Sequence, residues 1–244
     1  MAGKWGTTEA GSLPAMLREG TSTLHRAAER TPFQRVFFRA ELPREAYSEW
    51  MSRLWFIYDA LETAAEQLRD HPIVGAMYSP QLHRREGLEH DLTFYVGSDW
   101  RGRIAPSPVT TAYVERINWA RDEWPPGVVA HQWLRYLGSL GGQEVLRGLV
   151  NRAYGVTGEG WAFYEFPQID DVGAFFRDYH ARMDALPLTE DDKLRMVDEG
   201  NRAFQLNIDL TDELAADFAI EAPPGPESAE IEQLEAQAGK THAS

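Results

Sequence analysis

The chain has 244 residues, of which 43% are hydrophobic, and this length and composition suit one globular domain with a sizeable core. A formal net charge of −14 argues against nucleic-acid binding, which needs a basic face, and no segment approaches the roughly 18 apolar residues of a membrane span. The absence of cysteine excludes disulfides, thiolate metal sites and cysteine nucleophiles. Together with an N-terminus that lacks the apolar core of a secretory signal, these features predict a cytoplasmic protein that binds neither nucleic acid nor membrane.

Both ends of the chain differ in composition from the middle. Residues 1–12 are small and polar, and residues 219–244 form an acidic segment with few large apolar side chains. Such segments bury too little apolar surface to offset the entropy of ordering the chain. We therefore expect a flexible N-terminus at 1–12, a single folded domain at 13–218 and a disordered tail at 219–244, with a short helix around 231–234.

The first half of the domain has the hydrophobic period of α-helices. A first stripe of apolar residues runs from Leu13 to Ala28, and we expect Pro32 to stop that helix. A longer stripe follows Pro43, which is a favourable residue at the start of a helix. This second helix should end before Pro72, since the residue before a proline avoids helical backbone angles.

The second half continues the same period. The expected helices are a short one carrying Leu88, Leu92 and Tyr95, one capped by Ser107, one from about 128 to 154, one capped by Asp170, and a last long one that starts at Thr189. No segment alternates convincingly in the manner of a strand, and the run WAFYEF at 161–166 is expected to be a buried loop. The predicted class is therefore all-α, a single domain of helices packed around one core.

The segment RYLGSLGGQEVL places Gly138, Gly141 and Gly142 inside one of these helices. Each glycine in a helix interior costs roughly 0.5–1 kcal/mol relative to alanine, so three in five residues need an explanation. One interpretation is a tight contact between helices or a kink. The other is that the backbone must lie against a flat ligand such as heme, with no Cβ in the way.

A histidine on the first predicted helix is a second candidate feature. His25 lies four residues before Glu29, so the two side chains share one helical face. Neutral imidazole is a good iron ligand, and a carboxylate near its second nitrogen would fix the tautomer. The alternative is a histidine that forms ordinary hydrogen bonds at a helix surface.

These segments resemble the proximal and distal helices of heme oxygenases: LHRAAE at 24–29 and RYLGSLGGQEVL at 135–146. The similarity continues in three further segments, SPQLHRREGLEHDLTFYVG at 79–97, GEGWAFYEFPQI at 158–169 and AFQLNIDL at 203–210, in colinear order over roughly 13–215. By this resemblance the chain is identified as a member of the bacterial, soluble, biliverdin-producing type of the family. It implies a multi-helix domain at 13–218 that holds heme between a proximal and a distal helix.

The resemblance implies a role for individual residues. His25 matches the proximal iron ligand and Glu29 its hydrogen-bonding partner. Gly138 and Gly142 match distal glycines whose backbone lies over the heme. The remaining matches are Tyr58, Arg135 and Asn207 in a network that holds distal water, Phe204 on the pocket wall, and Arg18 as a partner of a heme propionate.

The sequence also departs from the family pattern. Ser139 stands where an aspartate usually organises water beside the iron, and a serine supplies a hydrogen bond but no fixed negative charge. Ser22, Trp133, Phe176 and His180 replace basic or phenolic residues expected near the propionates. Arg177 is a candidate substitute beside Phe176, with His180 close by in the sequence. These departures imply a heme rotated in its plane or bound less tightly.

The reaction implied by the resemblance is oxidative cleavage of heme at a meso carbon, which yields biliverdin, iron and carbon monoxide. Heme b is then both cofactor and substrate, and O2 is the oxidant. The sequence contains no flavin or nicotinamide fingerprint, so electrons must come from an external donor, either a ferredoxin or a flavoprotein reductase.

Three other functions are compatible with parts of the sequence. A non-catalytic heme-binding or heme-trafficking protein of the same fold would be compatible with Ser139. A carboxylate-bridged di-iron protein would use helical pairs such as Glu86 and His90, although a full ligand set is not evident. A cofactor-free member of the fold would act on a thiamine-like or quinone-like molecule and would not need His25. We expect His131, two turns before Gly138, to have a packing role.

Overall fold

The structure is a computed structural model that describes residues 11–223, and within these residues every regular element is a helix. The α-helices are α1 (Leu13–Gly20), α2 (Ser22–Glu29), α3 (Pro32–Phe38), α4 (Arg44–Gln67), α5 (Val74–Met77), α6 (Arg85–Tyr95), α7 (Pro108–Glu123), α8 (Pro126–Tyr154), α9 (Val172–Asp184) and α10 (Glu190–Asp217). Three short 3-10 helices are η1 (Pro80–Leu82), η2 (Trp100–Gly102) and η3 (Ala162–Tyr164). The predicted all-α class is confirmed. The helix expected around 231–234 lies outside the described residues.

Helix starts follow the capping residues in the sequence. The Ser107 hydroxyl accepts a hydrogen bond from the backbone N–H of Thr110 at the start of α7. At the start of α10, Thr189 and Asp192 form a reciprocal capping box, in which each side chain bonds the backbone N–H of the other residue. Both predicted helix starts are therefore confirmed, and each cap satisfies backbone donors that have no partner within the helix.

Two predicted boundaries are wrong. The stripe from Leu13 to Ala28 is not one helix, because the helical run is interrupted at Thr21 between α1 and α2. The helix does end before Pro32, as expected, but Pro32 is also the first residue of α3, where its missing N–H costs no hydrogen bond and Thr31 caps the new helix. The cap of α9 is Asp171, whose carboxylate accepts from Ala174 N, and not Asp170.

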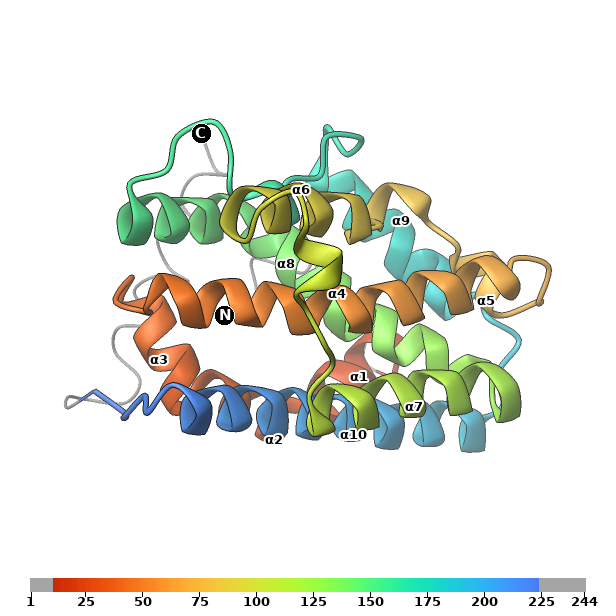
Figure 1. The fold of residues 1–244 in the computed structure, drawn as a ribbon. Coiled ribbons are helices and arrows are strands. Elements are labelled where there is room, and N and C mark those ends of the chain that lie inside the picture. Colours follow the sequence, from red (N-terminus) through yellow and green to blue (C-terminus); the bar gives the residue numbers. More distant parts are fainter. Residues whose placement is uncertain (1–10, 224–244) are drawn as a thin grey trace.

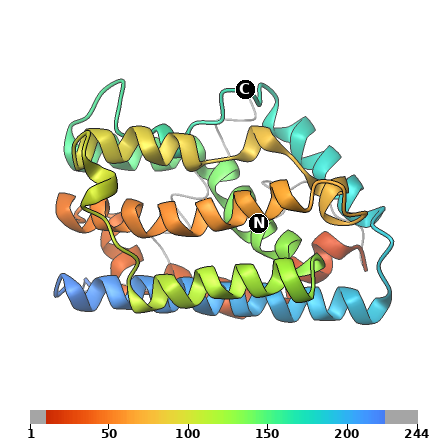
Figure 2. The same cartoon turned by 45° about the vertical axis from the view of Figure 1, so that its right-hand side comes forward.

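The helices pack in layers along the length of α4. Figure 1 shows α4 lying between α6 on one side and α7 with α10 on the other, while α8 crosses behind it, and Figure 2 shows the same layers from a second direction. The short helix α2 packs against α10 and its neighbours α1 and α3. None of the described helices is long and apolar enough to cross a membrane.

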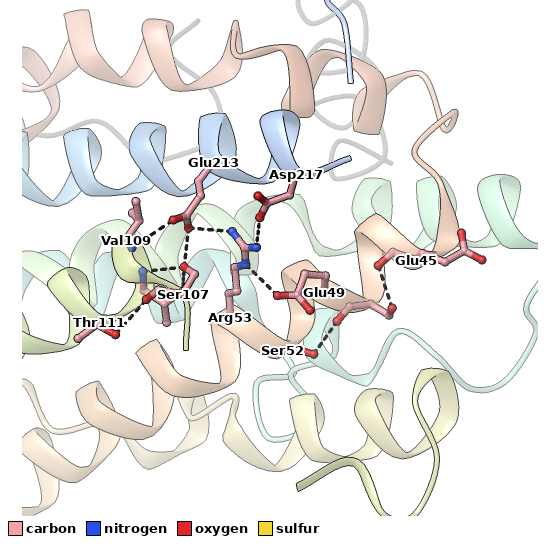
Figure 3. A network of polar contacts seen from close by, with 11 residues as sticks. Glu45, Glu49, Ser52, Arg53, Ser107, Val109, Thr111, Glu213 and Asp217 are labelled. Carbon is pink, nitrogen blue, oxygen red and sulfur yellow. Dashed lines mark hydrogen bonds and ion pairs between the residues drawn. The ribbon is translucent and has the colours of Figure 1, made fainter. Parts of the chain in front are cut away.

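A buried arginine ties three of these helices together (Figure 3). Arg53 of α4 is 4% exposed, and its guanidinium pairs with Glu49 at 3.0 Å, with Glu213 of α10 at 2.8 Å and with Asp217. Glu213 also accepts hydrogen bonds from the Ser107 hydroxyl and from the backbone N–H of Val109 at the start of α7. One carboxylate therefore joins α10 to both α4 and α7.

The run at 161–166 is held by a buried carboxylate. Asp91 of α6 accepts hydrogen bonds from Ala162 N at 2.8 Å and Phe163 N at 2.9 Å, which are the first donors of η3. Burial raises the pKa of Asp91 to about 6, while the two backbone donors oppose that shift. The buried loop predicted here is confirmed, with a single 3-10 turn inside it.

Candidate functional site

The polar residues expected at the distal side come together on three helices. The Tyr58 hydroxyl of α4 donates to the backbone carbonyl of Arg135 in α8 at 3.1 Å. The Arg135 guanidinium donates from Nη2 to Asn207 Oδ1 of α10 at 2.8 Å. The Ser139 hydroxyl donates to the same Arg135 carbonyl at 3.3 Å. Four residues from three helices, Tyr58, Arg135, Ser139 and Asn207, thus form one hydrogen-bonded cluster, which we call the distal cluster.

Tyr113 of α7 is a member of this cluster that the sequence did not reveal. Its hydroxyl accepts a hydrogen bond from Arg135 Nε at 3.2 Å, and the Arg135 guanidinium lies 4.9 Å from the centre of its ring. In the sequence Tyr113 reads only as part of the apolar stripe of its helix. Burial raises the pKa of Tyr58 to about 12 despite the opposing charge of Arg135, so its hydroxyl stays protonated and available as a donor.

The glycines of α8 differ in what surrounds them. A Cβ built on Gly138 would meet no atom within 4 Å, whereas Leu137 and Leu140 on either side are buried. A Cβ on Gly141 would lie at an ordinary contact distance of 3.5 Å from Phe176, and one on Gly142 would lie 3.3 Å from Leu146. Contact between helices therefore does not require glycine at 138. The open backbone there fits the alternative, a flat ligand lying against α8.

The candidate iron ligand lies on α2. The His25 side chain is 48% exposed, and its Nδ1 lies 3.7 Å from Glu29 Oε1. Phe204 of α10 holds the imidazole edge-on, with ring centroids 5.3 Å apart. Since Nδ1 faces the carboxylate, Nε2 is the nitrogen available to a metal. The residues present therefore fit an iron porphyrin, with a neutral nitrogen donor on one helix and an open backbone on another.

The residues expected near the propionates differ in their exposure to solvent. Arg18, near the end of α1, and Arg177 of α9 are exposed. His180 is only 9% exposed and packs against Phe176 with ring centroids 5.9 Å apart. Burial lowers the pKa of His180, Asp184 opposes this shift and the charge of Arg18 adds to it. Arg18 and His180 thus lie within electrostatic range of each other, and the lowered pKa favours the neutral form of His180.

A second polar cluster joins the three helices α7, α8 and α10. His131 of α8 is fully buried, and its Nε2 lies 3.0 Å from Glu199 Oε1 of α10. Arg116 of α7 donates from Nε to the same carboxylate at 2.8 Å. Burial alone would raise the pKa of Glu199, but hydrogen bonds from His131 and Arg116 lower it to about 2. His131 is therefore bound to Glu199 inside the protein, in agreement with the expected packing role.

The di-iron alternative finds no ligand set in the part of the chain that the structure describes. His90 and Glu86 lie 4.0 Å apart on α6, with side chains 71% and 92% exposed. Across residues 11–223, no three histidine or carboxylate side chains are grouped so that they could hold a metal ion.

Comparison with known proteins identifies the family of the chain. A family model described as heme oxygenase matches residues 12–213. Heme oxygenase 1 of Synechocystis sp. is 38% identical over 203 residues, which cover 83% of this chain and 85% of that protein. Heme oxygenase 1 of Rattus norvegicus is 39% identical over 207 residues, or 84% of this chain and 72% of that protein.

Solved structures give the same result. The crystal structure of heme oxygenase-1 from Synechocystis sp. in complex with heme superposes with a TM-score of 0.82 at 34% identity, covering 95% of this chain and 99% of that one. The heme oxygenase of Leptospira interrogans gives a TM-score of 0.81 at 33% identity, covering 83% of this chain and 99% of that one. The chain described here therefore belongs to the heme oxygenase family.

Proposed function

We propose that this protein is a heme oxygenase that binds heme b between α2 and α8 and cleaves the ring at a meso carbon to biliverdin, with release of iron and carbon monoxide. The observation that carries the proposal is the position of the distal cluster, which is built around Arg135 and Ser139 on either side of the open Gly138 backbone. Hydrogen-bond donors and free space at one place on a helix are what a gas molecule bound beside a flat ring requires.

Heme binding is assigned to residues on both sides of the pocket. His25 ligates the iron through Nε2, while the Glu29 carboxylate near Nδ1 fixes the tautomer and raises the basicity of the ligand. Phe204 holds the imidazole in orientation. Arg18 and Arg177, both exposed, are the candidate partners of the propionates, since a guanidinium binds a carboxylate through two parallel hydrogen bonds.

The distal residues position water and leave room for oxygen. Bound heme supplies the iron that binds O2 and the ring that is cleaved. Tyr58, Arg135 and Asn207 are already joined by hydrogen bonds, so they hold distal water without first having to reorganise. Gly138 leaves its side of α8 free of a side chain, and Ser139 adds a neutral hydroxyl where a carboxylate would add charge.

The reaction needs partners that the chain does not contain. O2 is one, and a ferredoxin or a flavoprotein reductase is the external source of electrons, because the sequence has no flavin or nicotinamide fingerprint. A cytoplasmic location would give the enzyme access to both classes of donor.

A single titration tests the proposal. Purified protein is titrated with hemin, a reductase system is added under air, and the absorption spectrum is followed. We expect a Soret band to appear with one hemin per chain and then to decay as bilin absorbance grows. Hemin that binds without conversion to bilin would contradict the proposed activity and would identify a heme-binding protein instead.

A further inference from the structure

Arg135 differs from the other buried arginines in the charge of its partners. Arg53, which is 4% exposed, pairs with three carboxylates, and Glu62 and Glu165 lie within electrostatic range of Arg84, which is 6% exposed. Arg135 is 8% exposed, and its guanidinium donates to a phenol and to an amide, both neutral. In the part of the chain that the structure describes, no carboxylate forms an ion pair with Arg135.

The charged side chains around Arg135 are engaged elsewhere. On α10, Glu199 stands about two turns before Asn207, and Arg116 of α7 and His131 of α8 already hold its carboxylate, at 2.8 Å and 3.0 Å. Burial lowers the pKa of His131, Glu199 opposes this shift, and the charges of Arg135 and Arg116 add to it. The carboxylate of Glu199 is therefore committed to the second polar cluster and not to Arg135.

The guanidinium keeps its charge in spite of burial. Burial alone would lower the pKa of Arg135, but the hydroxyls of Tyr113 on α7 and Tyr58 on α4 outweigh this effect and the pKa is raised. A phenol stabilises the cation as a hydrogen-bond acceptor, yet it brings no negative charge of its own. Buried charges in proteins are as a rule paired, because an unpaired one is costly. The distal cluster therefore holds one positive charge that lacks an opposite charge.

The distal cluster also offers a directed donor and free space. Asn207 turns its Oδ1 to the Arg135 guanidinium, so its N–H groups point elsewhere, and they donate to none of the residues that the structure describes. The backbone of Gly138 is open, with no atom within 4 Å of a Cβ built there. Ser139 lies four residues after Arg135, where a carboxylate would share its helical face, but it supplies a neutral hydroxyl. Charge, donor and space thus occur together without a carboxylate.

We propose that the distal cluster is a binding site for a small monovalent anion, which the Arg135 guanidinium and the Asn207 amide hold beside the open backbone of Gly138. The inference rests on the proposed function and deepens it, because it names the charge class of small ligand that this pocket favours at the heme iron. An anion supplies the missing charge, whereas a neutral molecule does not. Ser139 leaves the site open, since an aspartate there would itself pair with Arg135 and repel the anion.

Azide and imidazole separate the effect of charge from that of access. Both bind ferric heme, azide as an anion and imidazole as a neutral ring, and the shift of the Soret band of the hemin-loaded full chain gives each dissociation constant. Arg135→Met should weaken azide binding by about tenfold or more and change imidazole binding little. The matched control is Arg147→Met, which removes a positive charge from the same helix at a side chain that is 43% exposed, and it should change neither constant. An azide affinity unchanged in Arg135→Met, or an equal loss for both ligands, would overturn the inference.

A second comparison needs no heme. In the hemin-free chain, Ser139→Asp supplies the missing negative charge, whereas Ser139→Asn adds a side chain of the same size without the charge. The midpoint of urea unfolding at pH 7 should therefore be higher in Ser139→Asp than in Ser139→Asn. Equal midpoints would show that Arg135 does not lack an opposite charge, and would overturn the inference even if Arg135→Met failed to fold.

The two comparisons also separate this inference from the proposed function. A chain that gives no Soret band with hemin would contradict the proposed function, and the urea midpoints would still decide on the charge at Arg135. Bilin formation together with an azide affinity that does not depend on Arg135 would contradict the anion site alone.

Discussion

The two sides of the proposed heme site differ in how far their residues are buried and hydrogen-bonded within the protein. On the distal side, Arg135 is 8% exposed and bonds to Tyr113 and Asn207, while Tyr58 bonds to its carbonyl. On the proximal side, the His25 side chain is 48% exposed. Within α2, a helix of eight residues, only Ala28 is buried.

The contrast indicates which half of the site depends on the ligand for its structure. The distal cluster is preorganised because its polar groups are buried, and buried polar groups must find partners within the protein. A short helix with little buried apolar surface has low local stability, since helices in proteins are held mainly by packing. We therefore infer that heme completes the packing of α2, whereas the distal side is already formed.

Replacing the proximal ligand should have the largest effect. His25→Ala removes the iron ligand and should abolish the spectrum of histidine-ligated heme together with bilin formation. Added imidazole should restore the spectrum, because it fills the space left by the side chain. Optical and resonance Raman spectra of the hemin complex provide the measurement. An unchanged spectrum in the variant would mean that the ligand lies elsewhere.

Crowding the open backbone should affect turnover more than binding. Gly138→Leu and Gly142→Leu place a side chain where α8 is proposed to face heme, and ring opening should fall by about tenfold or more, a change of ~1.4 kcal/mol in the barrier. The matched control is Gly148→Leu, on the same helix, where a Cβ meets no atom within 4 Å, as at Gly138. Bilin formation under one reductant is compared across the three variants. If the first two convert heme as fast as the control, the glycines serve only helix packing.

Breaking the ion pairs of Glu199 should lower the free energy of unfolding without changing the iron ligand. Glu199→Gln removes the charge that pairs with His131 and Arg116, and breaking a buried ion pair costs about 3–5 kcal/mol. Urea unfolding at pH 7 measures the loss, and the spectrum of bound hemin should still show histidine ligation.

The pH dependence of that loss follows from the lowered pKa of Glu199. Its value in the folded protein is about 2, below the ordinary 4.5, so the contribution is present above pH 4.5 and is lost as the pH falls toward 2. The difference in unfolding free energy between wild type and Glu199→Gln should therefore shrink below pH 4.5. A difference that stays constant down to pH 3 would show that the pair does not act through its charge.

The smallest expected effect concerns Ser139. Its hydroxyl already bonds the Arg135 carbonyl at 3.3 Å, so it shares the holding of distal water with the rest of the cluster. Ser139→Asp should raise the bilin yield per heme and lower peroxidase-like oxidation of an added dye. Ser139→Ala should do the opposite, by about 1–3 kcal/mol in the partition between the two outcomes. Two variants that both match the wild type would identify the serine as a bystander.

Local signals in the sequence predicted most of the fold. Ser107 and Thr189 start helices as expected, since a capping residue acts on backbone groups only a few positions away. The apolar stripe does not reveal the interruption between α1 and α2 at Thr21, because the stripe continues across that residue. Pro32 predicts only that the preceding helix stops, because a proline suits the first turn of a helix as well as a loop and the sequence does not distinguish the two.

In the candidate site, only residues that stand in a recognisable sequence motif could be predicted. His25 and the α8 glycines stand in segments that resemble a known family, but Tyr113 belongs to the distal cluster through a contact with Arg135 that spans 22 residues. Tyr47, Tyr95 and Tyr154 likewise join three helices through ring contacts. No periodicity or spacing marks such residues, because their roles arise only from the packing of distant segments.

Amide hydrogen exchange with and without hemin tests most directly the claim that heme completes α2 against a preformed distal side. In the apoprotein, we expect rapid exchange in Ser22–Glu29 and slow exchange around Tyr58 in α4. Hemin should slow exchange strongly in α2 and leave the Tyr58 region nearly unchanged, and the gain in α2 should be lost in His25→Ala. Protection that appears instead around Tyr58, or an α2 that exchanges equally slowly in both states, would contradict the account.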